Sequence, residues 1–252
     1  MEKTRIGFIG VGAISGIYLE NITNMFPDME VYAVYDLLEE RAAAQETYHI
    51  PKRYTSLDQM LADPAVDIVL NLTRPSEHYA VTKAALLAGK PVYSEKPLAA
   101  TVAEGRELAA LAAEKGLALG GAPDTFLGAG LQTCRKLIED GYIGRPVGAA
   151  AFMLCHGHES WHPDPAFYYK RGGGPMMDMG PYYLTALTAL LGSVTEVTST
   201  ARKSFEQRTV TSQPRRGEVI DVEVPTHVNG ILQFESGAVR TVATSFDVYY
   251  PQ

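Results

Sequence analysis

The chain has 252 residues, of which 46% are hydrophobic and 20% are charged, and its formal net charge is −7. A negative chain without a basic run does not suit a nucleic-acid-binding protein. No apolar stretch approaches the roughly 18–20 residues of a membrane span, and we expect no signal peptide. Two cysteines are too few for a disulfide framework. We therefore expect a cytoplasmic protein of one large or two ordinary domains.

A glycine-rich turn follows the first predicted strand, residues 5–10. Residues 10–15 read Gly-Val-Gly-Ala-Ile-Ser and run into an apolar-periodic stretch typical of a helix. Strand, glycine turn and helix in this order form the context of a dinucleotide site. Gly10 permits the tight turn, Gly12 lets a pyrophosphate approach the helix start, and Ser15 stands where the motif has its third glycine. The residues expected to bind the cofactor here are Gly10, Gly12, Ala13 and Ile14.

An acidic residue ends the second predicted strand, residues 30–36. Asp36 lies 24 residues after Gly12 (36 minus 12), near the spacing of about 20 expected for the acid that binds the ribose hydroxyls of NAD. A helix N-cap is the alternative role for this residue. Leu37 and Leu38 follow it and offer nothing to a 2′-phosphate, although Arg41 could swing toward one. We therefore expect NAD in preference to NADP.

Strands and helices alternate as far as residue 121. We expect helices over 38–47, 56–62, 79–88 (capped by Ser76 and ended by Gly89) and 101–115, and strands near Tyr54, over 67–72, near Val92 and over 117–121. This alternation predicts a doubly wound parallel sheet, a Rossmann-type domain over residues 1–121. The carboxyl ends of parallel strands share one edge, so residues 10–15, 73–78 and 95–97 should meet there.

A lysine stands at this expected edge. Glu95-Lys96-Pro97 follows a short apolar strand, and Pro97 should end that strand. A solvated Glu–Lys pair is the plain alternative. The residues expected to contact the cofactor from these two strand ends are Thr73, Arg74, His78, Glu95 and Lys96.

After residue 121 the pattern changes. We expect a helix over 128–140, a strand over 147–155, a polar and aromatic loop over 156–165, glycines at 172–174 and a mostly buried helix over 176–191 that carries one charge, Asp178. Strands should follow over 194–204, 218–224, 227–234 and 238–246, with a hairpin turn at 235–237. Residues 122–252 therefore form an α+β domain with a mostly antiparallel open sheet. The many apolar residues in the strands of this open sheet predict a homo-oligomer, either a dimer or a tetramer.

Taken together, the glycine turn, Asp36, Glu95-Lys96-Pro97 and the glycines before Asp178 resemble the Gfo/Idh/MocA oxidoreductases across essentially the whole chain. The resemblance implies a Rossmann domain followed by an α/β domain, and hydride transfer between NAD(P) and a sugar, cyclitol or related polyol. Members of this family usually continue well past residue 252, so we expect a second domain that is shortened or incomplete.

The resemblance also implies the catalytic residues. Lys96, before a cis Pro97, would serve both substrate and cofactor. The family motif Asp-x-Gly-x-His maps onto residues 178–182, with Tyr182 in place of the histidine of many members. Tyr182 lies four residues from Asp178, so on one helix the two would share a face. We expect Lys96, Asp178 and Tyr182 to be catalytic, with Tyr182 relaying the proton that Lys96 exchanges with the substrate.

The loop over 156–165 carries three histidines, His156, His158 and His162, whose spacing could suit zinc. No carboxylate pattern accompanies them and hydride transfer needs no metal, so we expect none. The substrate contacts expected from this region are Trp161, His162 and Tyr168. Two other functions stay open: an inactive NAD-binding regulatory protein, and a lyase or glycosidase that uses NAD transiently.

Overall fold

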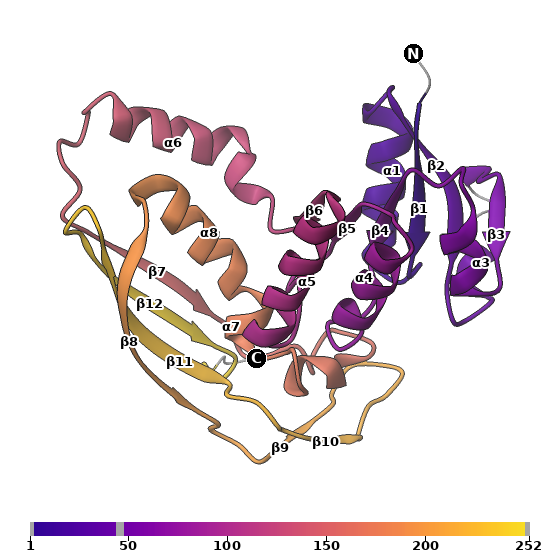
Figure 1. The fold of residues 1–252 in the computed structure, drawn as a ribbon. Coiled ribbons are helices and arrows are strands. Elements are labelled where there is room, and N and C mark those ends of the chain that lie inside the picture. Colours follow the sequence, from indigo (N-terminus) through magenta and orange to yellow (C-terminus); the bar gives the residue numbers. More distant parts are fainter. Residues whose placement is uncertain (1–2, 44–47, 250–252) are drawn as a thin grey trace. The chain divides into compact units, whose positions relative to one another are not determined.

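The computed structural model describes residues 3–43 and 48–249. The chain divides into two units, residues 1–122 and 123–252, each with its own sheet and core (Figure 1). Among the described helices, none is long and apolar enough to cross a membrane.

The first unit is built on a six-stranded parallel sheet in the order β3-β2-β1-β4-β5-β6. Its strands are β1 (Thr4–Ile9), β2 (Met29–Tyr35), β3 (Lys52–Tyr54), β4 (Ile68–Asn71), β5 (Val92–Ser94) and β6 (Leu119–Gly121). The chain moves outward from β1 to β3 and then returns to β4, so the strand order reverses between β1 and β4. Such a switch point opens a crevice at the carboxyl ends of the strands. The expected doubly wound parallel sheet is confirmed.

Helices cover both faces of this sheet (Figure 1). They are α1 (Ser15–Met25), α3 (Leu57–Ala62), α4 (His78–Leu87) and α5 (Val102–Lys115). Successive side chains of a strand point to opposite faces. Phe8 therefore packs with Leu19 of α1 in one core, whereas Ile9 belongs to the other core, with Leu86 of α4 and Leu108 of α5.

Two boundaries in the first unit differ from expectation. Ser76 does not cap α4, since the Glu77 N–H donates to the Arg74 carbonyl at 2.8 Å and closes a turn before the helix begins. The helix expected over 38–47 falls partly on residues 44–47, outside the described residues, and the part before them ends in the 3-10 turn η1 (Arg41–Ala43).

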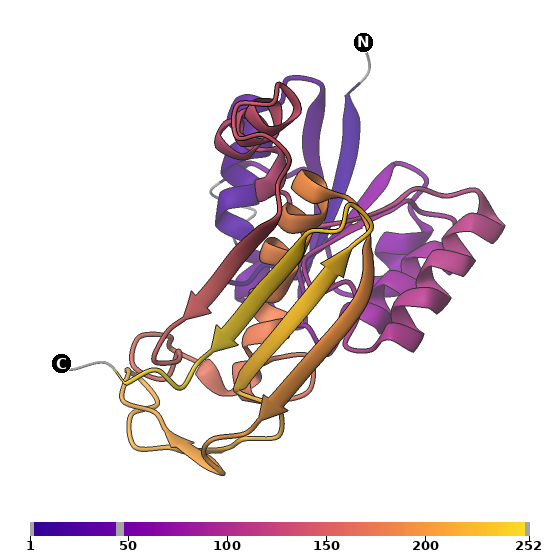
Figure 2. The same ribbon diagram turned by 90° about the vertical axis from the view of Figure 1, so that its left-hand side faces the viewer.

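The second unit holds a four-stranded sheet in the order β7-β12-β11-β8. These strands are β7 (Gly148–Leu154), β12 (Val239–Ser245), β11 (His227–Phe234) and β8 (Val194–Arg202), and a separate ribbon pairs β9 (Gln207–Thr209) with β10 (Val219–Asp221). Only the β7–β12 pair of the larger sheet is parallel, so the expected mostly antiparallel sheet is confirmed. Figure 2 looks onto this sheet, with α8 (Gly180–Leu191) behind it. The sequence signals did not predict β9.

The helix expected over 176–191 is two helices, α7 (Pro175–Asp178) and α8, separated at Met179. Pro181 has no N–H to donate to the Met177 carbonyl, as a continuous helix would require, and its ring would clash with that carbonyl, which explains the break. The helix is also less buried than expected, because only Gly180 and Leu187 of α8 are fully buried. The helix before β7 is α6 (Ala129–Glu139).

Candidate functional site

The chain turns sharply where β1 ends. Gly10 has a φ of 90°, and a Cβ there would lie 2.8 Å from the Leu72 carbonyl oxygen, so the position requires glycine. The Gly10 N–H donates to the Tyr35 carbonyl at 2.9 Å, and the Leu72 N–H donates to the Ile9 carbonyl at 2.8 Å. The turn is thereby fixed between the carboxyl ends of β2 and β4.

The second glycine of the turn borders open space. A Cβ on Gly12 would meet no protein atom within 4 Å. Ser15, at the third glycine position, is buried, and both its hydroxyl and its N–H donate to the Gly12 carbonyl, at 2.8 and 3.1 Å. No side chain caps the start of α1, whose N–H groups and positive dipole end suit a phosphate. The space beside Gly12 therefore fits the pyrophosphate of a dinucleotide.

Asp36 follows β2 and holds the glycine turn. One carboxylate oxygen accepts the Val11 N–H at 2.7 Å, and the other accepts the Leu38 N–H at 2.8 Å. Asp36 is half-buried. Each of its carboxylate oxygens accepts one backbone N–H and keeps a further lone pair that could accept a ribose hydroxyl. Its side chain is therefore both an anchor for the turn and a suitable partner for the ribose of NAD.

Asn71, which sequence reasoning missed, organises the loop after β4. Its fully buried amide donates to the His78 carbonyl at 3.1 Å and to the Thr82 hydroxyl at 3.0 Å. Its oxygen accepts the Thr73 N–H and hydroxyl, at 3.2 and 2.7 Å. A polar residue inside an otherwise apolar strand was the available signal, because a buried amide requires partners.

His78 joins two loops. The ring is 1% exposed, with Nδ1 2.6 Å from the Pro97 carbonyl oxygen and Nε2 2.9 Å from the Thr73 carbonyl oxygen. Carbonyls only accept hydrogen bonds, so both bonds form together only when both nitrogens carry protons. Since the protein engages both nitrogens, we expect His78 to act on a cofactor through these loops and not by direct contact.

Glu95 and Lys96 follow β5 at the same edge of the sheet. The Glu95 carboxylate accepts the Tyr18 hydroxyl of α1 at 2.8 Å and the Lys96 N–H at 2.9 Å, so it ties α1 to the end of β5. The Lys96–Pro97 peptide is cis, as the resemblance implies. Lys96 is half-buried, and Arg74 is exposed on the neighbouring loop.

In the second unit, three buried glycines, residues 172–174, lead into α7. A Cβ on Gly173 would collide with the carbonyl oxygens of Phe167 and Tyr168. The Asp178 N–H donates to the Gly174 carbonyl at 2.9 Å. The glycines thus let α7 approach the preceding loop closely and fix Asp178 at its end.

The loop after β7 gathers aromatic rings around His158. Tyr168 lies 3.9 Å from its ring centroid, Phe246 4.6 Å and Trp161 5.3 Å. His162 lies 5.4 Å from Trp161 and 5.3 Å from Tyr168. The three expected substrate residues, Trp161, His162 and Tyr168, are therefore brought together, with His158 among them.

A buried ionic network centred on Arg208 packs against this loop. Arg208 lies 3.3 Å from the Glu159 carboxylate and 3.2 Å from the Asp247 carboxylate. Tyr169, fully buried, donates to Glu159, and burial together with that carboxylate raises the pKa of Tyr169. Asp247 also accepts the Thr226 hydroxyl at 2.6 Å. Buried charges that are paired in this way are costly to separate, so this network stabilises the loop in its position.

Tyr182 lies half-buried in the first turn of α8, where its N–H donates to the Met179 carbonyl at 3.1 Å. The expectation that it shares one helix face with Asp178 is wrong, because the break at Met179 puts the two residues in different helices.

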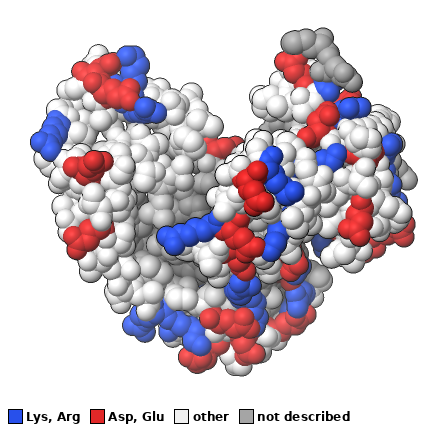
Figure 3. Space-filling model, in the orientation of Figure 1, with Lys and Arg blue, Asp and Glu red and all other residues white. Residues whose placement is uncertain are grey.

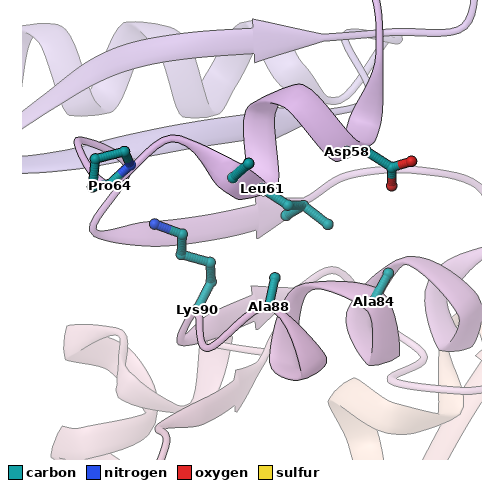
Figure 4. Close-up of a pocket in the computed structure, with 7 residues that line it drawn as sticks. Asp58, Leu61, Pro64, Ala84, Ala88 and Lys90 are labelled. Carbon is teal, nitrogen blue, oxygen red and sulfur yellow. The ribbon is translucent and has the colours of Figure 1, made fainter.

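No three His, Cys, Asp or Glu side chains within residues 3–43 and 48–249 are grouped to hold a metal ion. A hollow of about 530 Å³ lies between α3 and α4 (Figure 4), lined by Asp58, Leu61 and Lys90 among others. Lys90 and Pro64 precede β5 and β4, so the hollow lies at the amino-end edge of the sheet, opposite the glycine turn.

Known protein families match both units. A family model described as an oxidoreductase family with an NAD-binding Rossmann fold matches residues 4–121, and a GFO/IDH/MocA C-terminal domain model matches residues 131–252. This chain belongs to the Gfo/Idh/MocA oxidoreductase family.

Individual relatives carry sugar-related names. D-xylose dehydrogenase of Paenarthrobacter nicotinovorans is 31% identical over 68% of this chain and 43% of the relative. The 1,5-anhydro-D-fructose reductase of Ensifer adhaerens is 39% identical over 60% of this chain and 45% of the relative. A crystal structure of an NAD-binding oxidoreductase from Klebsiella pneumoniae has a TM-score of 0.84 and 26% identity, over 99% of this chain and 68% of that one. The matched part spans less than half the length of both curated relatives.

Proposed function

We propose that this protein is an oxidoreductase that transfers a hydride between NAD and a sugar, cyclitol or related polyol. The observation that carries the proposal is that the glycine turn, Asp36 and Lys96 lie at the carboxyl edge of one parallel sheet. Membership of the family supports it, as do the names D-xylose dehydrogenase and 1,5-anhydro-D-fructose reductase among the relatives.

We infer that NAD is preferred over NADP. The Asp36 carboxylate sits on the glycine turn, where its negative charge would repel a 2′-phosphate and accept the ribose hydroxyls. Leu37, 85% exposed, offers no partner to such a phosphate. Calorimetry should therefore give a clearly lower Kd for NAD than for NADP, and equal affinities would contradict the inference.

The nicotinamide supplies the hydride chemistry when it is bound. We propose that the Lys96 ammonium stabilises the negative charge that develops on the substrate oxygen and exchanges a proton with it. We assign Asp178 to orient substrate hydroxyls. We propose that Tyr182 relays that proton; a phenol with an ordinary pKa of about 10 is a poor base at neutral pH, so the relay needs a cation nearby to favour the ionised form.

The aromatic loop suits a polyol. Trp161 is 60% exposed and offers an apolar face to the C–H side of a sugar ring. The His162 Nδ1 accepts the Asp164 N–H at 3.0 Å, which leaves Nε2 as a donor in the neutral ring. Burial and the charge of Asp178 raise the pKa of Tyr168, so its hydroxyl stays protonated as a donor.

A screen of sugars, cyclitols and polyols with NAD and NADP in parallel tests the function. Growth of the reduced-nicotinamide absorbance band with one substrate class is the expected result. Product without a net change in that band would instead indicate transient use of NAD. NAD binding without any product would indicate a regulatory protein.

A further inference from the structure

His158 has no role in the proposed chemistry, although its environment is unusual for a histidine. Its side chain is 12% exposed, and Nε2 lies 3.5 Å from an Asp178 carboxylate oxygen. Both ring nitrogens are buried, and neither has a hydrogen-bond partner among the described residues. A buried neutral imidazole would leave one donor and one acceptor unsatisfied, which is costly. A second proton would strengthen the contact with Asp178.

The rings around His158 favour a cation. The Tyr168 ring centroid at 3.9 Å and the Phe246 centroid at 4.6 Å are within the distance of about 6 Å at which a ring attracts a positive charge that lies over its face. The opposing effect is burial, which disfavours any charged form unless an opposite charge is near. Asp178 supplies that charge.

The other titratable groups near this pair leave the surroundings negative. Arg208 lies between Glu159 and Asp247, so one cation faces two carboxylates in the network below the loop. The Asp178 charge contributes to the raised pKa of both Tyr168 and Cys155, whose larger cause is burial. Tyr169 donates to Glu159 and adds no cation. These groups together carry more negative than positive charge.

We propose that His158 is a positioning residue for Asp178: a protonated imidazole behind the carboxylate that keeps it ionised and fixed in orientation. A tyrosine stands at position 182, where many members of the family have a histidine, and the loop after β7 places His158 beside Asp178. The catalytic consequence rests on the proposed function, whereas the ion pair itself does not.

Nuclear magnetic resonance of ¹⁵N-labelled protein tests the ion pair without any substrate. At pH 7 the His158 ring should give the spectrum of a doubly protonated imidazolium, and Asp178→Asn should convert it to a neutral tautomer. Exposed His49 serves as an internal reference. A neutral His158 in the wild-type protein, or a ring unaffected by Asp178→Asn, would overturn the proposal.

Steady-state kinetics test the proposed effect of the His158–Asp178 ion pair on catalysis. His158→Phe keeps an aromatic ring without a charge, and His158→Gln keeps a hydrogen-bond donor without a charge. Because either change would leave the Asp178 carboxylate misplaced, both should lower kcat by roughly 10- to 100-fold. Without the imidazolium, the acidic limb of the pH profile of kcat/KM should move to higher pH. His227→Gln, on β11 and hydrogen-bonded to Ser245, is the matched control and should match wild type. Unchanged kcat and pH profile in both His158 variants would overturn the proposal, and absent turnover in the wild type would count against the function alone.

Discussion

Lys96 is the side chain whose loss should separate cofactor binding from chemistry. Lys96→Ala removes the proposed proton-exchanging cation but leaves the glycine turn and Asp36 intact. We expect turnover to fall by roughly a hundredfold or more, the usual range for an acid–base group, with NAD affinity nearly unchanged. Lys115→Ala, at the end of α5, is the control. Steady-state kinetics and calorimetry check both parts, and wild-type turnover in Lys96→Ala would refute the assignment.

His78 should matter to binding through the loops that it joins. His78→Phe leaves the buried Pro97 carbonyl and the half-buried Thr73 carbonyl without this partner, at a cost of about 1–3 kcal/mol in unfolding free energy. We expect the Kd for NAD to rise several-fold, with no such change in His49→Phe at an exposed site. Denaturant unfolding and NAD titration measure the two effects. Wild-type affinity in a folded His78→Phe protein would show that the loops hold their positions without the ring.

Residue spacing predicted the residues of the glycine turn and Asp36, because a phosphate-binding turn requires glycine at fixed positions. It could not predict Asn71 or the pairing of His158 with Asp178. Both depend on which loops meet in space, and residues 158 and 178 belong to different elements. A histidine in a polar loop carries no periodic signal, so its partner appears only when the fold is known.

At the scale of elements, the parallel sheet was predictable because strand and helix patterns alternate along residues 1–121. Thr101 caps α5 by accepting the Glu104 N–H at 3.2 Å, as the sequence indicates. The division of α7 from α8 was missed although Pro181 stands in the sequence, because the surrounding apolar run outweighed one proline. The ribbon strand β9 is short and polar, Gln207–Thr209, and has no alternation to detect.

Asp63, after α3, ties that helix to β3 and should make the first unit sensitive to acid. It accepts hydrogen bonds from Lys52 at 2.8 Å, from Tyr54, and from the Ala65 N–H at 2.8 Å. The Lys52 and Tyr54 hydrogen bonds, in that order, hold the pKa of Asp63 below its usual range. A lowered pKa stabilises the fold at pH values above the ordinary value of about 3.9, and this stabilisation is lost as the pH falls from there through the folded-state value.

Asp63→Asn should therefore lower the unfolding free energy by about 1–3 kcal/mol at pH 7. The gap between wild type and variant should narrow as the pH falls below about 4. Urea unfolding across this range measures it, with Asp58→Asn on α3 as the control. A gap that does not depend on pH would show that the charge of Asp63 is not what stabilises the unit.

At the scale of the whole molecule, one face of the second sheet predicts self-association. Phe152, Leu154, Ile231 and Val239 are 56%, 51%, 48% and 49% exposed, and the strand registers put them on one face. By contrast, acidic and basic side chains are interspersed on the surface drawn in Figure 3. We propose that a second copy covers the apolar face.

Light scattering of the full natural protein at micromolar concentration should give a dimer or tetramer. Ile231→Glu should shift it toward monomer, whereas Val197→Glu, which lies on the opposite face since Val197 pairs with Leu232, should not. A monomeric wild-type protein would refute this interface.

Hydride transfer itself is the central claim, and isotope transfer tests it most directly. A polyol deuterated at the carbon that is oxidised, incubated with NAD and the wild-type protein, should yield reduced nicotinamide that carries the deuterium, with transfer strongly slowed in Lys96→Ala. Mass spectrometry of the recovered cofactor reads the label. The account would be contradicted if oxidised product formed together with unlabelled reduced cofactor. It would also be contradicted if the protein bound NAD but no deuterated sugar, cyclitol or polyol reduced it.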